Sequence, residues 1–94
     1  MTFGELVDYL QWNRAENPHA ATWAMERRYR IIVDGESAVS IRGKGMKMTF
    51  HEFVDYAVDL LERQSAVADT PMDKEYGLYF YGYSTVRLSD CAYD

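Results

Sequence analysis

Two stretches decide how this sequence is interpreted: residues 1–10 read MTFGELVDYL, and residues 48–57 read MTFHEFVDYA. When the 94-residue sequence is shifted by 47 positions, half its length, the two halves align without a gap. The alignment contains 13 identities, which continue beyond the decapeptide through the pairs Met25/Met72, Tyr29/Tyr76 and Val39/Val86. A chance match of one helix start would not keep this register over further segments. The sequence therefore predicts an internal duplication.

Each copy of the decapeptide begins with a helix-capping signal. Thr2 is followed three residues later by Glu5, and Thr49 by Glu52. In such a capping box the threonine hydroxyl accepts a hydrogen bond from the backbone N–H three residues on, and the glutamate carboxylate accepts one from the threonine N–H. The repeated letters predict two helix starts rather than a catalytic motif, because capping and the helix dipole already account for acids in a first turn.

The hydrophobic pattern changes in the same way within both copies. Apolar residues at helical spacing predict helices over residues 3–14 and 50–66. Each helix is followed by alternation with a period of two, which predicts two strands per copy, with turns at Asp34-Gly35 and Gly82. We expect the strands to turn ten side chains inward: Tyr29, Ile31, Val33, Val39, Ile41, Tyr76, Leu78, Phe80, Val86 and Leu88.

One copy of helix–strand–strand would bury too little surface to be stable alone. We therefore expect a single domain over residues 1–94, in which the repeats 1–47 and 48–94 share a core across a pseudo-twofold axis. The expected fold is α+β, a tandem αββαββ duplication forming a four-stranded antiparallel sheet with two helices on one face. This order is a circular permutation of the ferredoxin-like βαββαβ order, and it would place the second strand of each hairpin centrally.

Composition narrows the class of protein. The apolar fraction is 48% and the charged fraction 27%, as is typical of globular domains. No apolar run approaches the length of a membrane helix, and the N-terminus lacks the basic region of a secretory signal. Cys91 is the sole cysteine, so it has no internal disulfide partner. These features predict a cytoplasmic protein that does not bind membranes and whose cysteine is a free thiol.

The two halves differ in charge. Residues 1–47 contain seven Lys/Arg and six Asp/Glu, a net of +1, and residues 48–94 contain three and nine, a net of −6, which together give the chain's −5. This difference predicts a weakly basic side and a strongly acidic side. One interpretation of it is neutral drift of surface residues, and the other is that the acidic half binds a basic partner. The acidic face of the second helix, with Asp55, Asp59 and Glu62, is a candidate surface for a basic partner.

A sheet covered by helices on one face leaves its other face open. The residues expected there are Arg28, Arg30, Ile32, Ser40, Arg42, Tyr79, Tyr81, Thr85 and Arg87, with Tyr83 at a turn. Tyrosine and arginine are enriched at binding hot spots, and tyrosines beside an isoleucine would form a large apolar patch. The alternative is that tyrosine occurs here for its strand propensity. The face is a candidate interface with a protein partner or with a second copy of the chain.

The function favoured by these features is a small, acidic, non-catalytic protein-binding module, comparable in composition with inhibitors, antitoxins, immunity proteins and phage-encoded modulators. The alternative is a single-stranded nucleic-acid-binding domain that stacks bases on the tyrosines of the open face. Negative charge and the lack of an RNP1-like run weaken that alternative. We expect no catalytic site, cofactor or metal, since His19 and His51 have no metal-ligand spacing and residues 42–47 lack the P-loop pattern.

Overall fold

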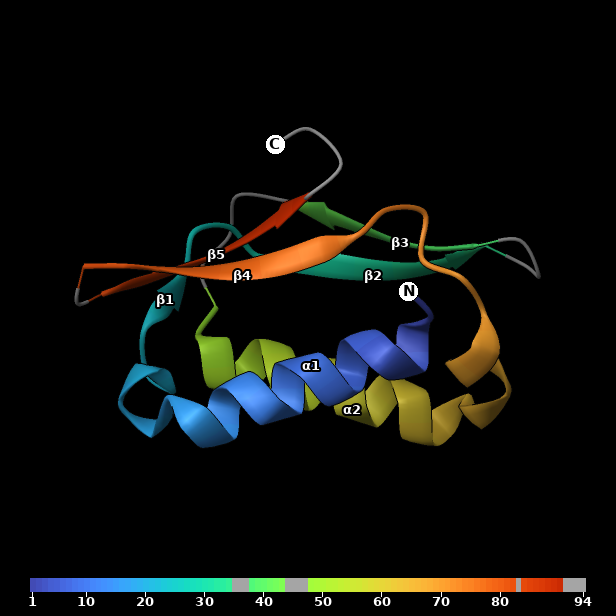
Figure 1. Ribbon diagram of the computed structural model, residues 1–94, viewed down its shortest axis with the longest axis horizontal. Coiled ribbons are helices and arrows are strands. Elements are labelled where there is room, and N and C mark those ends of the chain that lie inside the picture. Colours follow the sequence, from blue (N-terminus) through green and yellow to red (C-terminus); the bar gives the residue numbers. More distant parts are fainter. Residues whose placement is uncertain (35–37, 44–47, 83, 91–94) are drawn as a thin grey trace.

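The computed structural model describes residues 1–34, 38–43, 48–82 and 84–90 (Figure 1). In chain order the helices and strands are α1 (Phe3–Glu16), the short 3₁₀ helix η1 (Pro18–Ala20), β1 (Ala24–Met25), β2 (Tyr29–Asp34), β3 (Ala38–Gly43), α2 (Phe50–Arg63), the 3₁₀ helix η2 (Ser65–Asp69), β4 (Tyr76–Tyr81) and β5 (Thr85–Asp90). The predicted order of two long helices and four long strands is confirmed. Within the described ranges no helix is long and apolar enough to cross a membrane.

Both predicted capping boxes are present. Glu5 N–H donates to Thr2 Oγ1 at 3.2 Å, and Thr2 N–H donates to Glu5 Oε1 at 2.8 Å. The equivalent distances between Thr49 and Glu52 are 3.1 and 2.8 Å. Hydrogen bonds from the threonine backbone lower the pKa of both glutamates, because they stabilise the ionised carboxylate. The α1 helix continues two residues beyond its predicted end, whereas α2 stops at Arg63 and the chain continues as η2.

The core lies between the helix layer and the strands. Figure 1 shows α1 and α2 side by side beneath all the strands. The three phenylalanines Phe3, Phe50 and Phe53 are fully buried at its centre. All ten strand residues predicted to face inward are either buried or packed against this cluster. The period-two pattern therefore predicted the face of each long strand correctly.

The strands do not form the single four-stranded sheet expected from the sequence. β2 and β3 pair antiparallel as one sheet, while β4 and β5 pair antiparallel in a second sheet that β1 joins parallel to β5. The inner edges of β3 and β5, which were expected to meet, are occupied by other segments: Met72 bridges Val39 of β3, and β1 lies along β5. β5 still lies centrally in its own sheet. The permuted ferredoxin-like arrangement stays a prediction.

The segments on these edges show that the repeats are intertwined. Phe50 N–H donates to the Trp23 carbonyl at 2.9 Å, and its equivalent 47 positions earlier, Phe3 N–H, donates to the Thr70 carbonyl at the same distance. Two further backbone bonds repeat the exchange, Met25 N–H to Met48 O at 2.7 Å and Met72 N–H to Met1 O at 2.9 Å. The connection after each helix therefore binds the start of the other repeat's helix, which accounts for the pseudo-twofold axis.

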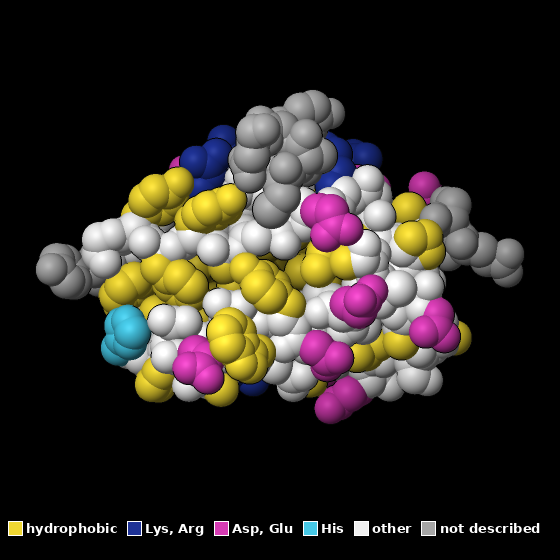
Figure 2. Space-filling view, in the orientation of Figure 1, with side chains coloured by type: hydrophobic (Ala, Val, Ile, Leu, Met, Phe, Trp, Pro, Cys, Tyr) yellow, Lys and Arg dark blue, Asp and Glu magenta, His cyan; other side chains and the backbone are white. Residues whose placement is uncertain are grey.

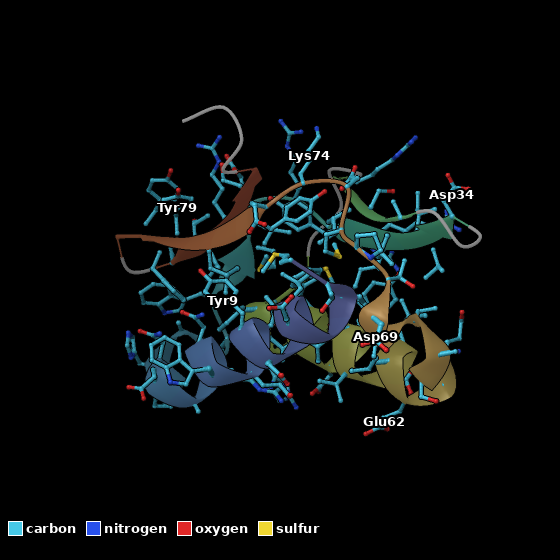
Figure 3. All side chains as sticks on the ribbon, turned by 45° about the vertical axis from the view of Figure 1, so that its right-hand side comes forward. Tyr9, Asp34, Glu62, Asp69, Lys74 and Tyr79 are labelled. Carbon is cyan, nitrogen blue, oxygen red and sulfur yellow. The ribbon has the colours of Figure 1, made fainter. Side chains whose placement is uncertain are left out.

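Tyrosine hydroxyls make a second set of reciprocal contacts. Tyr9 on α1 points toward β4 (Figure 3), where its hydroxyl accepts a hydrogen bond from Leu78 N–H at 2.9 Å. The equivalent bonds are Ile31 N–H to Tyr56 at 3.1 Å, Leu88 N–H to Tyr29 at 3.3 Å and Ile41 N–H to Tyr76 at 3.4 Å. Each hydroxyl occupies one position on a strand edge of the other repeat, so that position is closed to further strand pairing.

Candidate binding surfaces

The open sheet face is the side of the strands that α1 and α2 do not cover (Figure 1). Arg28, Arg30, Arg42, Tyr79, Tyr81 and Arg87 are exposed, and Ile32, Ser40 and Thr85 are half-buried. These residues therefore belong to the surface, as predicted, whereas Tyr83 lies outside the described residues. On the face shown in Figure 2, the visible Lys and Arg side chains gather mainly on the sheet side of the molecule.

The β4–β5 part of this face carries the tyrosines. Tyr79 and Tyr81 are 39% and 48% exposed, and Tyr79 projects from β4 away from the helices (Figure 3). Arg87 lies directly opposite Tyr79 in the hairpin register. Its guanidinium donates to the Tyr81 hydroxyl at 3.2 Å and lies 3.3 Å from a Glu26 carboxylate oxygen. Arg87 is thus held beside the rings by contacts within the protein, which leaves the tyrosines as the contact groups of this part.

The β2–β3 part carries arginines of a different kind. Arg30 lies directly opposite Arg42 in the hairpin. Like charges on directly opposed residues disfavour a strand pair. Among the described residues, neither arginine forms a side-chain hydrogen bond or an ion pair. This pair is therefore a local concentration of positive charge that a carboxylate or phosphate from outside the chain would stabilise.

The acidic surface predicted on α2 is partly neutralised by its neighbours. Arg14 of α1 donates to Asp55 at 2.6 Å, and His51 Nε2 lies 3.1 Å from the same carboxylate. Asp59 pairs with Arg63 one turn later at 2.9 Å. Glu62 points away from the sheet (Figure 3) and has no ion-pair partner among the described residues. Because two of the three predicted acids already contact cations, this surface is a weaker candidate than the sheet face.

Charge also differs between the layers of the fold, in addition to the difference between the two repeats. The helices α1 and α2 contain seven acidic and two basic residues, a net of −5, and the rest of the chain contains eight of each. The helix layer therefore carries the acidic excess, and the sheet face lies opposite it.

The sequence also points to Trp12 as a position at which the two repeats differ, and this side chain of α1 is 62% exposed. The equivalent residue in the other repeat is Asp59. Within the described part of the chain, no three His, Cys, Asp or Glu side chains form a group that could hold a metal ion, and Cys91 lies outside that part. Comparisons with protein-family models, curated proteins and solved structures found no match.

Proposed function

We propose that the protein is a non-catalytic binding module that contacts another protein through its open sheet face. The observation that carries this proposal is that Arg30 and Arg42 lie directly opposite each other and have no ion-pair partner among the described residues. Directly opposed strand residues have Cβ atoms about 5 Å apart, so two positive charges share a small area of surface. Carboxylates from a partner would form charge-assisted hydrogen bonds with both guanidinium groups.

The tyrosines support a protein partner. Tyr79 and Tyr81 offer broad rings with a polar tip, a combination that is enriched at the energetic centres of protein interfaces. A nucleic acid, in contrast, presents phosphates along its whole length and is best bound by a continuous basic track. On this face Arg87 is already paired with Glu26, so the unpaired positive charge is concentrated at Arg30 and Arg42.

The test compares two double variants with the same charge change. Arg30→Ser with Arg42→Ser removes two arginines from the sheet face, and the matched control, Arg14→Ser with Arg63→Ser, removes two from the helix layer. Tagged proteins capture partners from the host lysate, and calorimetry then measures the affinity for the purified partner. We expect the sheet variant to bind about tenfold or more weakly, as for loss of hot-spot residues, and the control to bind like the wild type. Equal binding by the wild type and the sheet variant would contradict the proposal.

The same protein samples test two other partners. Light scattering measures the mass of the wild type; a dimer that Tyr79→Ala with Tyr81→Ala converts to a monomer would identify a second copy as the partner. A labelled single-stranded oligonucleotide tests the nucleic-acid alternative, which predicts binding at low salt that weakens steeply as salt is added. Absence of binding at low salt would remove that alternative.

A further inference from the structure

A groove of about 500 Å³ lies between the outer edge of β2 and the end of the helix layer. Its walls are residues 30–33 of β2, Leu60 and Gln64 at the end of α2, and Val67 of η2. This volume falls within the range of about 300–1,000 Å³ that is typical of ligand sites. Five of these seven residues are apolar, and polar atoms of the lining share its exposed surface, so the groove offers both apolar contact and hydrogen-bonding groups.

The internal duplication shows what fills the equivalent space at the other end of the molecule. There, three aromatic rings follow one another from the outside inward. His19 stacks edge-on against Trp23 at 5.3 Å between ring centroids, Trp23 meets Phe80 at 6.2 Å, and Phe80 meets Phe50 at 5.6 Å. Figure 2 shows apolar side chains gathered between the sheet and the helices on that side. The chain therefore closes one end of its pseudo-symmetric core with its own aromatic side chains.

The equivalent positions in the other repeat hold much smaller residues, one of which, Val33, lines the groove. The replacements are Ala66 for His19, Thr70 for Trp23 and Val33 for Phe80. These replacements remove three rings, while the backbone hydrogen bonds to Trp23 and Thr70 from Phe50 and Phe3 stay equivalent. The groove is thus the place of an aromatic side chain that this repeat does not supply.

The edge of β2 offers backbone hydrogen bonds beside this space. Val39 N–H donates to the Pro71 carbonyl at 3.0 Å, so this N–H points away from β2. Val33 lies directly opposite Val39 in the hairpin, and the antiparallel pattern therefore directs the N–H and C=O of Val33 to the outer edge of β2. Among the described residues these two groups have no hydrogen-bond partner outside the hairpin. At Ile31, in contrast, the Tyr56 hydroxyl occupies the edge. An added chain would therefore pair at Val33, at the mouth of the groove.

Charge restricts the identity of such a chain. Of the described residues that line the groove, Arg30 alone is charged, and neither it nor Arg42 opposite has an ion-pair partner in the described part of the chain. We propose that the groove binds an aromatic side chain from an extended, acidic segment of another protein. The segment's backbone bonds to Val33, and one of its carboxylates pairs with Arg30. The proposal does not depend on the tyrosine part of the sheet face.

The probe is an acetylated, amidated peptide of sequence Glu-Glu-Trp-Glu-Glu, titrated into nitrogen-15-labelled protein and followed by amide chemical shifts. We expect shifts centred on Val33, Leu60, Gln64 and Val67, with a dissociation constant on the order of 1 mM, as suits a short peptide that loses much conformational freedom. The peptide with alanine in place of tryptophan should bind about tenfold or more weakly, because a buried ring contributes the larger share of the apolar contact.

Two variants test the groove itself. Val33→Phe with Thr70→Trp introduces the residues that fill the equivalent space, and it should weaken binding about tenfold or more. Gln64→Trp blocks the groove from an exposed position, which keeps the test valid if the double variant does not fold. Trp12→Ala removes an exposed ring of α1 that does not line the groove, so it is the matched control and should bind the peptide like the wild type.

Four outcomes would overturn the proposal. The first is an absence of shifts at the groove amides, and the second is equal binding by the alanine peptide, which would mean that charge alone attracts it. The third is equal binding by N-acetyltryptophanamide, which would indicate a small aromatic ligand. The fourth is movement of the groove amides with protein concentration in the absence of peptide, which would indicate a second copy of the chain. Failure of this test leaves the capture experiment with Arg42→Ser alone unaffected, because Arg42 does not line the groove.

Discussion

The Tyr29 hydroxyl is the clearest single test of how the two repeats are held together. It accepts a hydrogen bond from Leu88 N–H at 3.3 Å and donates one to the Leu88 carbonyl at 3.1 Å. Tyr29 and Leu88 are both buried, with 8% and 6% of their surface exposed. Tyr29→Phe removes the hydroxyl alone and keeps the ring, which packs against Phe53 at 5.6 Å. The substitution therefore isolates the hydrogen bonds between the repeats.

The expected cost follows from burial. A buried backbone group that loses its partner costs about 1–3 kcal/mol, because water cannot replace the bond. Leu88 loses a donor and an acceptor together, so we expect a loss of about 2 kcal/mol. For a domain of this size that corresponds to a fall in melting temperature of about 8–16 °C. The duplication supplies a comparison, Tyr76→Phe, whose hydroxyl accepts from Ile41 N–H and donates to the Asp73 carboxylate from a half-buried side chain. Water can reach this site, so we expect a loss below about 1 kcal/mol.

Urea denaturation of the wild type and both variants measures these losses, with the m-value checking that the unfolded states are comparable. A shift in midpoint at constant m gives the change in the free energy of unfolding. If Tyr29→Phe costs less than about 0.5 kcal/mol, the hydroxyl does not hold β2 to β5. Equal losses in the two variants would also contradict the reasoning, since burial would then not decide the cost.

Three further predictions concern the caps, pH and the duplication. Thr49→Ala should reduce stability by about 1 kcal/mol in urea denaturation, because Glu52 N–H loses its cap. Burial raises the pKa of Tyr29, so the unfolded chain releases this proton first and stability should fall as pH rises above about 10, less so in Tyr29→Phe. Residues 48–94 alone should show no folded monomer by circular dichroism and sedimentation, because β5 and the start of α2 bond to the other repeat.

Local patterns predicted much of this protein correctly. The capping boxes, the faces of the four long strands and the exposed residues of the sheet face all follow from spacing within a few residues. The groove was not predicted, because a groove exists where side chains are too small for their surroundings. The comparison of repeats could have indicated it, since Trp23 and Phe80 are replaced by Thr70 and Val33.

The sequence by itself determined the duplication, the helix starts and the inward and outward sides of each strand, because these depend on side-chain type at fixed local spacing. Tertiary structure alone decided which strand edges meet. Backbone N–H and C=O groups are the same at almost every residue, so no residue pattern marks Met72 as the partner of Val39, or the Leu88 backbone as the partner of the Tyr29 hydroxyl. These pairings form because the backbone N–H and C=O groups at the strand edges of both copies need hydrogen-bond partners within one core. The result is two sheets connected by crossing segments, where the sequence predicted a single sheet.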